Sequence, residues 1–95
     1  MNEFENKTVL VTGSGKGLGS AIALEAAKRG CNVVVHYRSN EESAKRVFAE
    51  VQSTGCKCML IKADLGVQEE IDSMFSQIES EFGGVDILVN NAAMQ

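Results

Sequence analysis

The chain has 95 residues and a formal net charge of −4, and 44% of its residues are hydrophobic while 23% are charged. This length suits one small domain, and the composition is typical of a folded globular protein rather than a disordered segment. Nucleic-acid-binding domains usually carry a basic surplus or stripe, whereas the nine lysine and arginine residues here are scattered through an acidic chain. We therefore expect one globular domain over residues 1–95 that does not bind nucleic acid.

Membrane association and secretion are not indicated by the sequence. No apolar run approaches the roughly 20 residues that a membrane-spanning helix requires. The first five residues (MNEFE) are polar and acidic, unlike a signal peptide. The three cysteines, Cys31, Cys56 and Cys58, are most simply interpreted as reduced thiols. Together these features predict a cytoplasmic protein without a membrane partner.

Four short apolar runs alternate with three helical patterns. The first run, residues 7–12 (KTVLVT), is continuous and rich in β-branched residues, as expected of a strand buried on both faces. A glycine-rich segment leads from it into an amphipathic helix over residues 18–29. That helix is predicted to stop at Gly30, since glycine readily adopts the left-handed conformation that follows many helices. The second apolar run, residues 32–37 (NVVVHY), comes next.

A second helix is predicted after this run. Ser39 as N-cap and Glu42 three positions later fit a capping box at its start. Its apolar stripe consists of Ala44, Val47, Phe48 and Val51. Gly55 is expected to end the helix, and the third apolar run covers residues 56–63 (CKCMLIKA).

The third helix has the most regular apolar spacing in the chain. Its stripe, which is interpreted as core, consists of Ile71, Met74, Phe75, Ile78 and Phe82. Two glycines, Gly83 and Gly84, are predicted to end it before the fourth apolar run over residues 85–90 (VDILVN). The resulting order, βαβαβαβ, favours an α/β fold with a parallel sheet and right-handed crossovers.

The loop between the first strand and the first helix, residues 12–19 (TGSGKGLG), is rich in glycine. Glycines there permit positive φ angles and let the backbone approach a pyrophosphate closely, while the free N–H groups of the helix start favour its negative charge. A tight strand-to-helix turn in some other α/β protein is the alternative when this loop is considered alone. A Walker A loop is excluded because no Gly-Lys-Ser/Thr triplet is present.

Three further features narrow the interpretation. Asp64-Leu65 follows the third strand, the segment 90–93 (NNAA) follows the fourth, and the glycine spacing is TGxxxGxG. Together, across all 95 residues, they resemble the short-chain dehydrogenase/reductase family and especially its 3-oxoacyl-(acyl-carrier-protein) reductases. The resemblance implies a three-layer Rossmann-type sheet with strand order 3-2-1-4, the N-terminal half of a doubly wound fold. Ala93 departs from the family pattern, which usually has glycine there.

The resemblance also implies which residues would bind a nicotinamide dinucleotide. Those expected along its phosphates and ribose are Gly13, Ser14, Gly15, Lys16, Gly17, Leu18 and Gly19. The Asp64 carboxylate would accept from the adenine amino group, with a backbone contact from Leu65; a cap on the following helix is the alternative role for Asp64. The residues expected along the adenosine ribose are Asn91, Ala92 and Ala93. Asn90 would bond neighbouring strands.

The end of the second strand favours one form of the cofactor. Dinucleotide folds that prefer NAD place an acidic residue about 20 residues after the glycine loop, whereas residues 36–39 (HYRS) contain no carboxylate. Arg38 can instead pair with a 2′-phosphate, with Ser39 beside it and Lys16 as a second cation in reach. The sequence therefore predicts NADP(H) in preference to NAD(H). Solvated surface charges are the alternative for Arg38 and Lys16.

The catalytic residues of the family are not found in this sequence. Full-length relatives use a serine and a Tyr-x-x-x-Lys pair to pass hydride from NADPH to a ketone. Here the single tyrosine, Tyr37, is followed four residues later by Glu41 rather than lysine. We therefore predict no catalytic residue and no hydride transfer by this chain alone, which resembles the adenosine-binding half of a truncated reductase.

The cysteines and the histidine are weaker evidence for a functional site. Cys56 and Cys58 could suggest a metal pair, but zinc sites usually need four ligands and no second pair is present, so no metal is predicted. His36, the single histidine, is expected to be packed rather than catalytic.

A function from a different class is also open: a non-catalytic, self-associating module whose cofactor site is vestigial. In the implied strand order the fourth strand is an apolar edge, which favours pairing with another chain. The sequence thus predicts a homodimer formed through the fourth strand and the third helix.

Overall fold

The computed structural model describes residues 3–92. Its elements are β1 (Thr8–Val11), α1 (Gly17–Lys28), β2 (Asn32–Tyr37), α2 (Glu41–Gln52), β3 (Cys58–Lys62), α3 (Gln68–Phe82) and β4 (Ile87–Val89). The four strands form one parallel sheet in the order β3-β2-β1-β4. The alternation of strands and helices, the parallel pairing and the strand order are confirmed.

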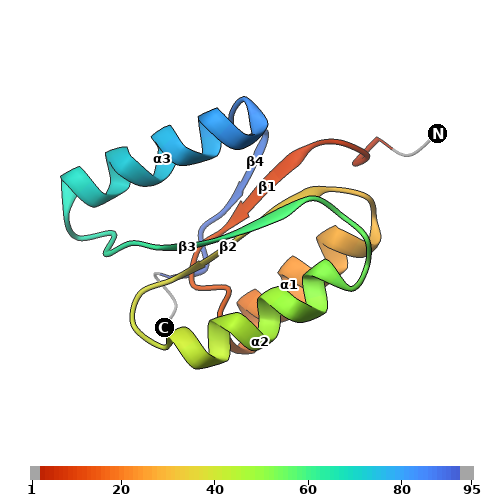
Figure 1. The fold of residues 1–95 in the computed structure, drawn as a ribbon, viewed down its shortest axis with the longest axis horizontal. Helices are drawn as coiled ribbons and strands as arrows, with labels where there is room; N and C mark the ends of the chain where they lie inside the picture. Colours follow the sequence, from red (N-terminus) through yellow and green to blue (C-terminus); the bar gives the residue numbers. More distant parts are fainter. Residues whose placement is uncertain (1–2, 93–95) are drawn as a thin grey trace.

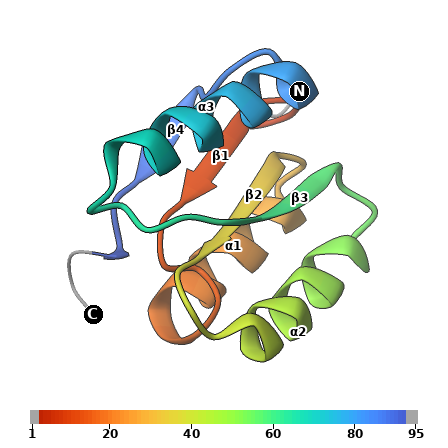
Figure 2. The same cartoon turned by 60° about the vertical axis from the view of Figure 1, so that its left-hand side comes forward.

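The sheet is the middle of three layers (Figure 1). Helices α1 and α2 cover one face and α3 lies on the other, as the rotated view in Figure 2 also shows. Alternate residues of β1 serve the two faces, because Val9 and Val11 join the core beneath α1 and α2 while Leu10 joins the core beneath α3. All four residues of β1 are buried, which explains why its sequence is continuously apolar rather than alternating.

Parallel strands bring their carboxyl ends to one edge of the sheet. The segments that follow β1, β2, β3 and β4 therefore meet there, although they are far apart in the sequence. Backbone hydrogen bonds join them: Ser14 N–H donates to His36 O at 2.9 Å, and Thr12 N–H donates to Val89 O at 3.0 Å. This edge is where ligands bind in open α/β sheets.

The predicted start of α2 is wrong by one residue. Asn40, not Ser39, is the N-cap, and its Oδ1 accepts from Ser43 N–H at 3.0 Å. The predicted capping box pairs Ser39 with Glu42, whereas the backbone of Ser39 is used in a turn, with Glu41 N–H donating to its carbonyl. Both residue types cap helices well, and the geometry of the turn after β2 selects the second.

The core role predicted for the stripe of α3 is correct only in part. Met74 and Ile78 are buried, but 39% of Phe75 is exposed. The helix begins at Gln68, three residues before the first apolar position, and Gly83 ends it in the left-handed conformation as predicted. Strands β3 and β4 are also shorter than their apolar runs, beginning at Cys58 and Ile87. Only a narrow strip of α3 touches the sheet, so a stripe of five apolar residues exceeds what is buried.

Candidate functional site

Glycines shape the loop between β1 and α1. Gly13 and Gly17 have φ angles of 64° and 59°, which glycine adopts without strain. Gly19 is constrained by space instead, because a Cβ there would lie 2.5 Å from both Gly13 O and Asn91 Nδ2. The first turn of α1 therefore packs directly against the loop, and only glycine fits at that contact.

A buried histidine from β2 fixes one side of this loop. Gly13 N–H donates to Nδ1 of His36 at 2.9 Å, and Nε2 of the same ring lies 2.9 Å from Ala63 O. His36 is 1% exposed, as expected for a packed histidine. Burial lowers the pKa of His36, because a charged ring is disfavoured there, while the Ala63 carbonyl opposes this shift. The ring thus joins the loop after β1 to the end of β3.

The other side of the loop is fixed from the end of β4. Asn91 is 4% exposed, and its Nδ2 donates to Gly13 O at 3.1 Å. The Thr12 hydroxyl oxygen accepts from the N–H groups of Asn91 and Ala92, at 2.9 and 3.1 Å. That hydroxyl also lies 3.3 Å from Asn90 Oδ1, so Asn90 links two neighbouring strands as predicted.

Ser14 is used inside the protein rather than toward a ligand. Its side chain is fully buried, and its Oγ accepts from His36 N–H at 2.9 Å. Together with Asn91, it is a predicted site residue whose side chain is directed into the loop-to-strand packing. Both hold the backbone that forms the site.

A cavity of about 260 Å³ lies beside the loop, at the carboxyl ends of the strands. Its lining consists of Gly13, Gly15, Lys16, His36, Tyr37, Arg38, Ser39, Asn40 and Ala92. Six of these are predicted site residues, and they come from three separate segments. Two cationic side chains line the cavity: Lys16 comes from the loop and Arg38 from the end of β2.

A second cavity, of about 540 Å³, adjoins the first. Its lining consists of His36, Arg38, Ala63, Asp64, Leu65, Gly66, Asn90 and Ala92. Three residues, His36, Arg38 and Ala92, line both cavities, so the two are neighbouring parts of one cleft. The predicted residues Asp64 and Leu65 lie in this second part, away from the glycine loop.

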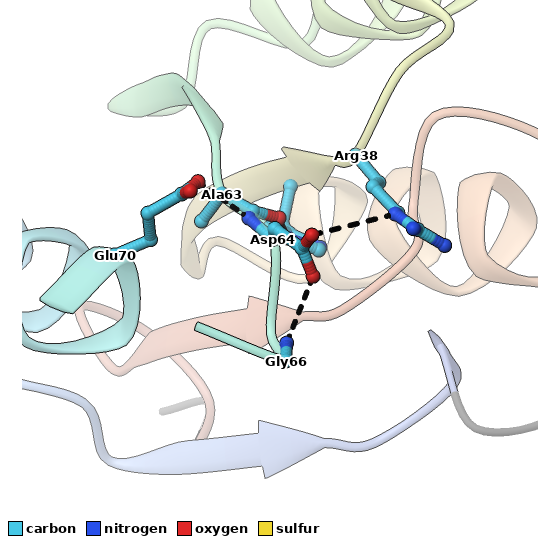
Figure 3. Close-up of polar contacts among 6 residues, drawn as sticks. Arg38, Ala63, Asp64, Gly66 and Glu70 are labelled. Atoms are coloured by element: carbon cyan, nitrogen blue, oxygen red, sulfur yellow. Dashed lines mark hydrogen bonds and ion pairs between the residues drawn. The ribbon is translucent and has the colours of Figure 1, made fainter. Parts of the chain in front are cut away.

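Asp64 organises the segment after β3 (Figure 3). Its Oδ1 accepts from Gly66 N–H at 2.9 Å, and its own N–H donates to Oε1 of Glu70 in α3 at 2.8 Å. Its Oδ2 lies 3.9 Å from Nε of Arg38, an ion pair between largely exposed side chains. The alternative that Asp64 caps the following helix is wrong, because Val67 is the N-cap of α3 and makes no side-chain cap.

Gly17, Leu18 and Gly19 lie outside both cavity linings. Gly17 and Gly19 belong to the first turn of α1, and Leu18 between them is 61% exposed. Lys16 is the N-cap of α1 and makes no side-chain cap with the helix, so its ammonium group is not used there. Ala93 lies outside the described residues.

Tyr37 does not have the surroundings of a catalytic acid or base. Its hydroxyl donates to Oε1 of Glu41 at 3.3 Å. Burial and the neighbouring Glu41 carboxylate both raise the pKa of Tyr37, the opposite of what proton transfer near neutral pH requires.

Two absences apply to residues 3–92. They contain no group of three or more His, Cys, Asp or Glu residues able to hold a metal ion. Within the same range no helix is long and apolar enough to cross a membrane. The three cysteines, Cys31, Cys56 and Cys58, are free thiols, with Cys31 buried and the other two partly so.

Sequence reasoning missed the role of His36, which joins the site together. The available signal was its position: a polar residue that follows three valines near the end of a strand (NVVVHY) whose last five residues are all buried. A buried polar side chain needs a hydrogen-bonding partner, and the nearest backbone without strand pairing is the glycine loop.

Comparison with known proteins agrees with this geometry. The chain is 42% identical over 94 residues to 3beta-hydroxysteroid dehydrogenase 1 of Eggerthella lenta, covering 99% of this chain and 36% of that protein. It is 39% identical over 89 residues to a 3-oxoacyl-(acyl-carrier-protein) reductase of Staphylococcus epidermidis, covering 94% of this chain and 36% of that one. The chain thus spans about a third of the length of these relatives.

Solved structures and the family profile point the same way. A short chain dehydrogenase from Burkholderia cenocepacia, solved in complex with NADP, superposes with a TM-score of 0.87 at 35% identity, covering 94% of this chain and 36% of that chain. The profile described as short chain dehydrogenase matches residues 7–95. With its Rossmann-type sheet and glycine loop, this chain belongs to the short-chain dehydrogenase family.

Proposed function

We propose that residues 1–95 form a single NADP(H)-binding unit, the nucleotide-binding half of a short-chain oxidoreductase that reduces a ketone. One observation carries the cofactor preference: Lys16 and Arg38, from different segments, line the same cavity beside the glycine loop. A 2′-phosphate between them would be bound by two cations. Arg38 lines both cavities, and its Nε lies 3.9 Å from Oδ2 of Asp64, so the guanidinium is available at their junction.

The rest of the cofactor site follows from the same cleft. The pyrophosphate would lie on the loop between Gly13 and Gly17, and the adenine would occupy the second cavity beside Asp64 and Leu65. The adenosine ribose would lie between these, against Ala92. The side chains of Ser14 and Asn91 would support this site from behind, and Ala93 is proposed to extend it.

The substrate is proposed on the resemblance to 3-oxoacyl-(acyl-carrier-protein) reductases. Named relatives of similar identity include a steroid dehydrogenase as well as an oxoacyl reductase. What this chain shares with both is therefore proposed to be cofactor binding, with NADPH as the hydride donor for a carbonyl. We expect these 95 residues alone to give no turnover of an acetoacetyl thioester with NADPH, because the family's catalytic serine and Tyr-x-x-x-Lys pair are not found in them.

Calorimetric titration of the chain with NADPH and with NADH tests the cofactor proposal. A charge-assisted hydrogen bond contributes about 1.5–3 kcal/mol, so we expect NADPH to bind at least roughly tenfold more tightly. Arg38→Ala should remove most of this difference while affecting NADH little. The matched control is Arg46→Ala, which removes the same charge from an exposed position on α2 outside both cavities. Equal affinities for the two dinucleotides in the unaltered chain would refute the preference.

A second function is favoured by one specific feature, an exposed large apolar side chain on each of β4 and α3. Leu88 of β4 is 55% exposed and is the register partner of the buried Leu10, and Phe75 of α3 is 39% exposed. β4 is also an edge of the described sheet. A self-associating module with a vestigial site would dimerise there and bind neither dinucleotide. Sedimentation at tens of micromolar would then show a dimer that Leu88→Lys converts to monomer, whereas a monomeric unaltered chain would contradict it.

A further inference from the structure

His36 occupies an unusual place for a titratable side chain. It is 1% exposed, it lies in the middle layer of the fold, and it lines both parts of the cleft. Each ring nitrogen has a backbone partner at 2.9 Å, and the two partners belong to different segments. One is Gly13 of the dinucleotide loop, and the other is Ala63, directly before Asp64.

These two contacts determine where the ring proton lies. A backbone N–H can only donate, so Nδ1 must accept from Gly13 and carry no proton. A carbonyl oxygen can only accept, so Nε2 must carry the proton that it donates to Ala63. The geometry therefore requires a neutral ring in one tautomer. A doubly protonated ring would direct an N–H at the N–H of Gly13.

The segments that meet at the cleft beside the ring carry charged side chains. They are Lys16 on the loop, Arg38 after β2, Asp64 after β3 and Glu70 in α3. Arg38 and Asp64 are paired with each other, and Glu70 accepts from the Asp64 backbone. Burial is the main influence on the ring and disfavours its charged form.

We propose that His36 is the positioning residue of the dinucleotide loop: its neutral ring, protonated on Nε2, holds Gly13 against the end of β3, and protonation of Nδ1 releases the loop and weakens dinucleotide binding in acid. The effect on dinucleotide binding rests on the proposed function, whereas the effect on the position of the loop does not. Gly13 is the point of control because its carbonyl is held by Asn91 and its N–H by His36. The N–H and the carbonyl belong to the two peptide groups that meet at the Gly13 Cα. When the His36 contact becomes repulsive, the first of these groups can rotate about that Cα while Asn91 still holds the second.

The chain is well suited to a test of this proposal, because His36 is its single histidine. Histidine is the only side chain whose ordinary pKa lies between about 5 and 8, and only perturbed thiols and the α-amino group also titrate in that range. Nitrogen NMR of the ring in the unaltered chain identifies the tautomer directly. We expect an unprotonated Nδ1 and a protonated Nε2 at pH 7.5, and a Gly13 amide shift that follows the ring titration as the pH falls. A proton on Nδ1 at pH 7.5, or a Gly13 shift independent of the ring, would overturn the proposal.

Two variants separate the two contacts. In His36→Asn, the amide oxygen stands the same number of bonds from Cβ as Nδ1, so it can accept from Gly13 without titrating. In His36→Gln, the amide nitrogen matches Nε2 in the same way, so it can donate to Ala63 but leaves the Gly13 contact unmade. The two variants thus preserve opposite halves of the bridge.

Binding is then measured with NADH from pH 7.5 down through the pH at which NMR shows the ring to titrate. NADH is used because it lacks the 2′-phosphate, which titrates near pH 6 in phosphate monoesters. The affinity of the unaltered chain should fall by about tenfold for each pH unit below the pKa of the ring. The affinity of His36→Asn, whatever its value at pH 7.5, should stay constant within about twofold, and His36→Gln should bind weakly throughout. Equal pH profiles for the unaltered chain and His36→Asn would refute the proposal that protonation of His36 weakens dinucleotide binding.

Failure of the two proposals can be told apart. If neither dinucleotide binds at any pH, the proposed cofactor function fails for this chain, and the ring and Gly13 shifts still decide whether His36 holds the loop. If NADH binds with the same affinity at every pH, the cofactor function stands and the role of His36 is refuted.

Discussion

The two ends of the sheet are held together by different means. At the carboxyl ends of the strands, buried side chains such as His36, Ser14 and Asn91 bond segments that are 22 to 78 residues apart. At the amino ends, the links are more exposed: Asn32 Nδ2 donates to Asn6 O, and the Arg29 guanidinium lies 5.7 Å from the Phe4 ring centroid. Buried polar networks rigidify what they join when fully satisfied. The end that carries the cleft is thus the end whose loops are fixed by side chains.

The two ends of the sheet should differ most in how a glycine-to-alanine substitution at each affects dinucleotide binding. Gly19→Ala places a methyl group 2.5 Å from Gly13 O and Asn91 Nδ2, so the loop must move. Overpacking of this kind costs about 1–3 kcal/mol, and dinucleotide affinity should fall by at least roughly tenfold. Calorimetric titration and thermal unfolding measure the two effects.

The matched control is Gly55→Ala, in the turn that leads to the amino end of β3. Gly55 has a φ of 87°, and among the described residues beyond its chain neighbours no heavy atom lies within 4 Å of the place its methyl group would take. The cost is therefore conformational alone, about 1–2 kcal/mol, and dinucleotide binding should not change. Loss of binding in Gly55→Ala equal to that in Gly19→Ala would show that binding follows overall stability rather than the shape of the loop.

A smaller difference is expected for two asparagines. Asn91→Ala removes the donor to Gly13 O at the cleft, and a buried group that loses its partner costs about 1–3 kcal/mol. At the opposite end, Asn32→Ala removes an exposed donor to Asn6 O, which water can replace, and a partly buried donor to Thr8 Oγ1. It should cost about 0.5–1.5 kcal/mol. Urea unfolding gives both values.

Binding separates the asparagines further. We expect Asn91→Ala to weaken dinucleotide binding, since the Gly13 carbonyl then loses the Asn91 donor, and Asn32→Ala to leave it unchanged. Weakening of similar size in both variants would mean that the buried network at the carboxyl ends has no special role in shaping the site.

The same contrast explains what could be predicted from the sequence. The fold follows from local patterns: continuous apolar strands such as residues 7–12, a helix stripe and terminal glycines. The glycine loop and Asp64 could be placed at the cleft because the carboxyl ends of parallel strands meet. The inward direction of Ser14 and Asn91 could not, because it depends on hydrogen bonds to residues 22 and 78 positions away. Side chains near a ligand and side chains that support the loop have the same polar character in the sequence.

The smallest expected effect concerns Cys58, at the amino end. Burial, with a further contribution from the neighbouring Cys56, raises the pKa of the Cys58 thiol to about 11. Only the thiolate reacts with alkylating agents, so at pH 8 about one thiol in a thousand is reactive. Alkylation of Cys58 should therefore accelerate by about tenfold for each pH unit up to about 11, as followed by peptide mass spectrometry. NADH binding should be unaffected by Cys58→Ser, since the thiol lines neither part of the cleft. Rapid alkylation at pH 8 would show that the amino end opens readily, and the contrast between the two ends would then be one of mobility as well as of bonding.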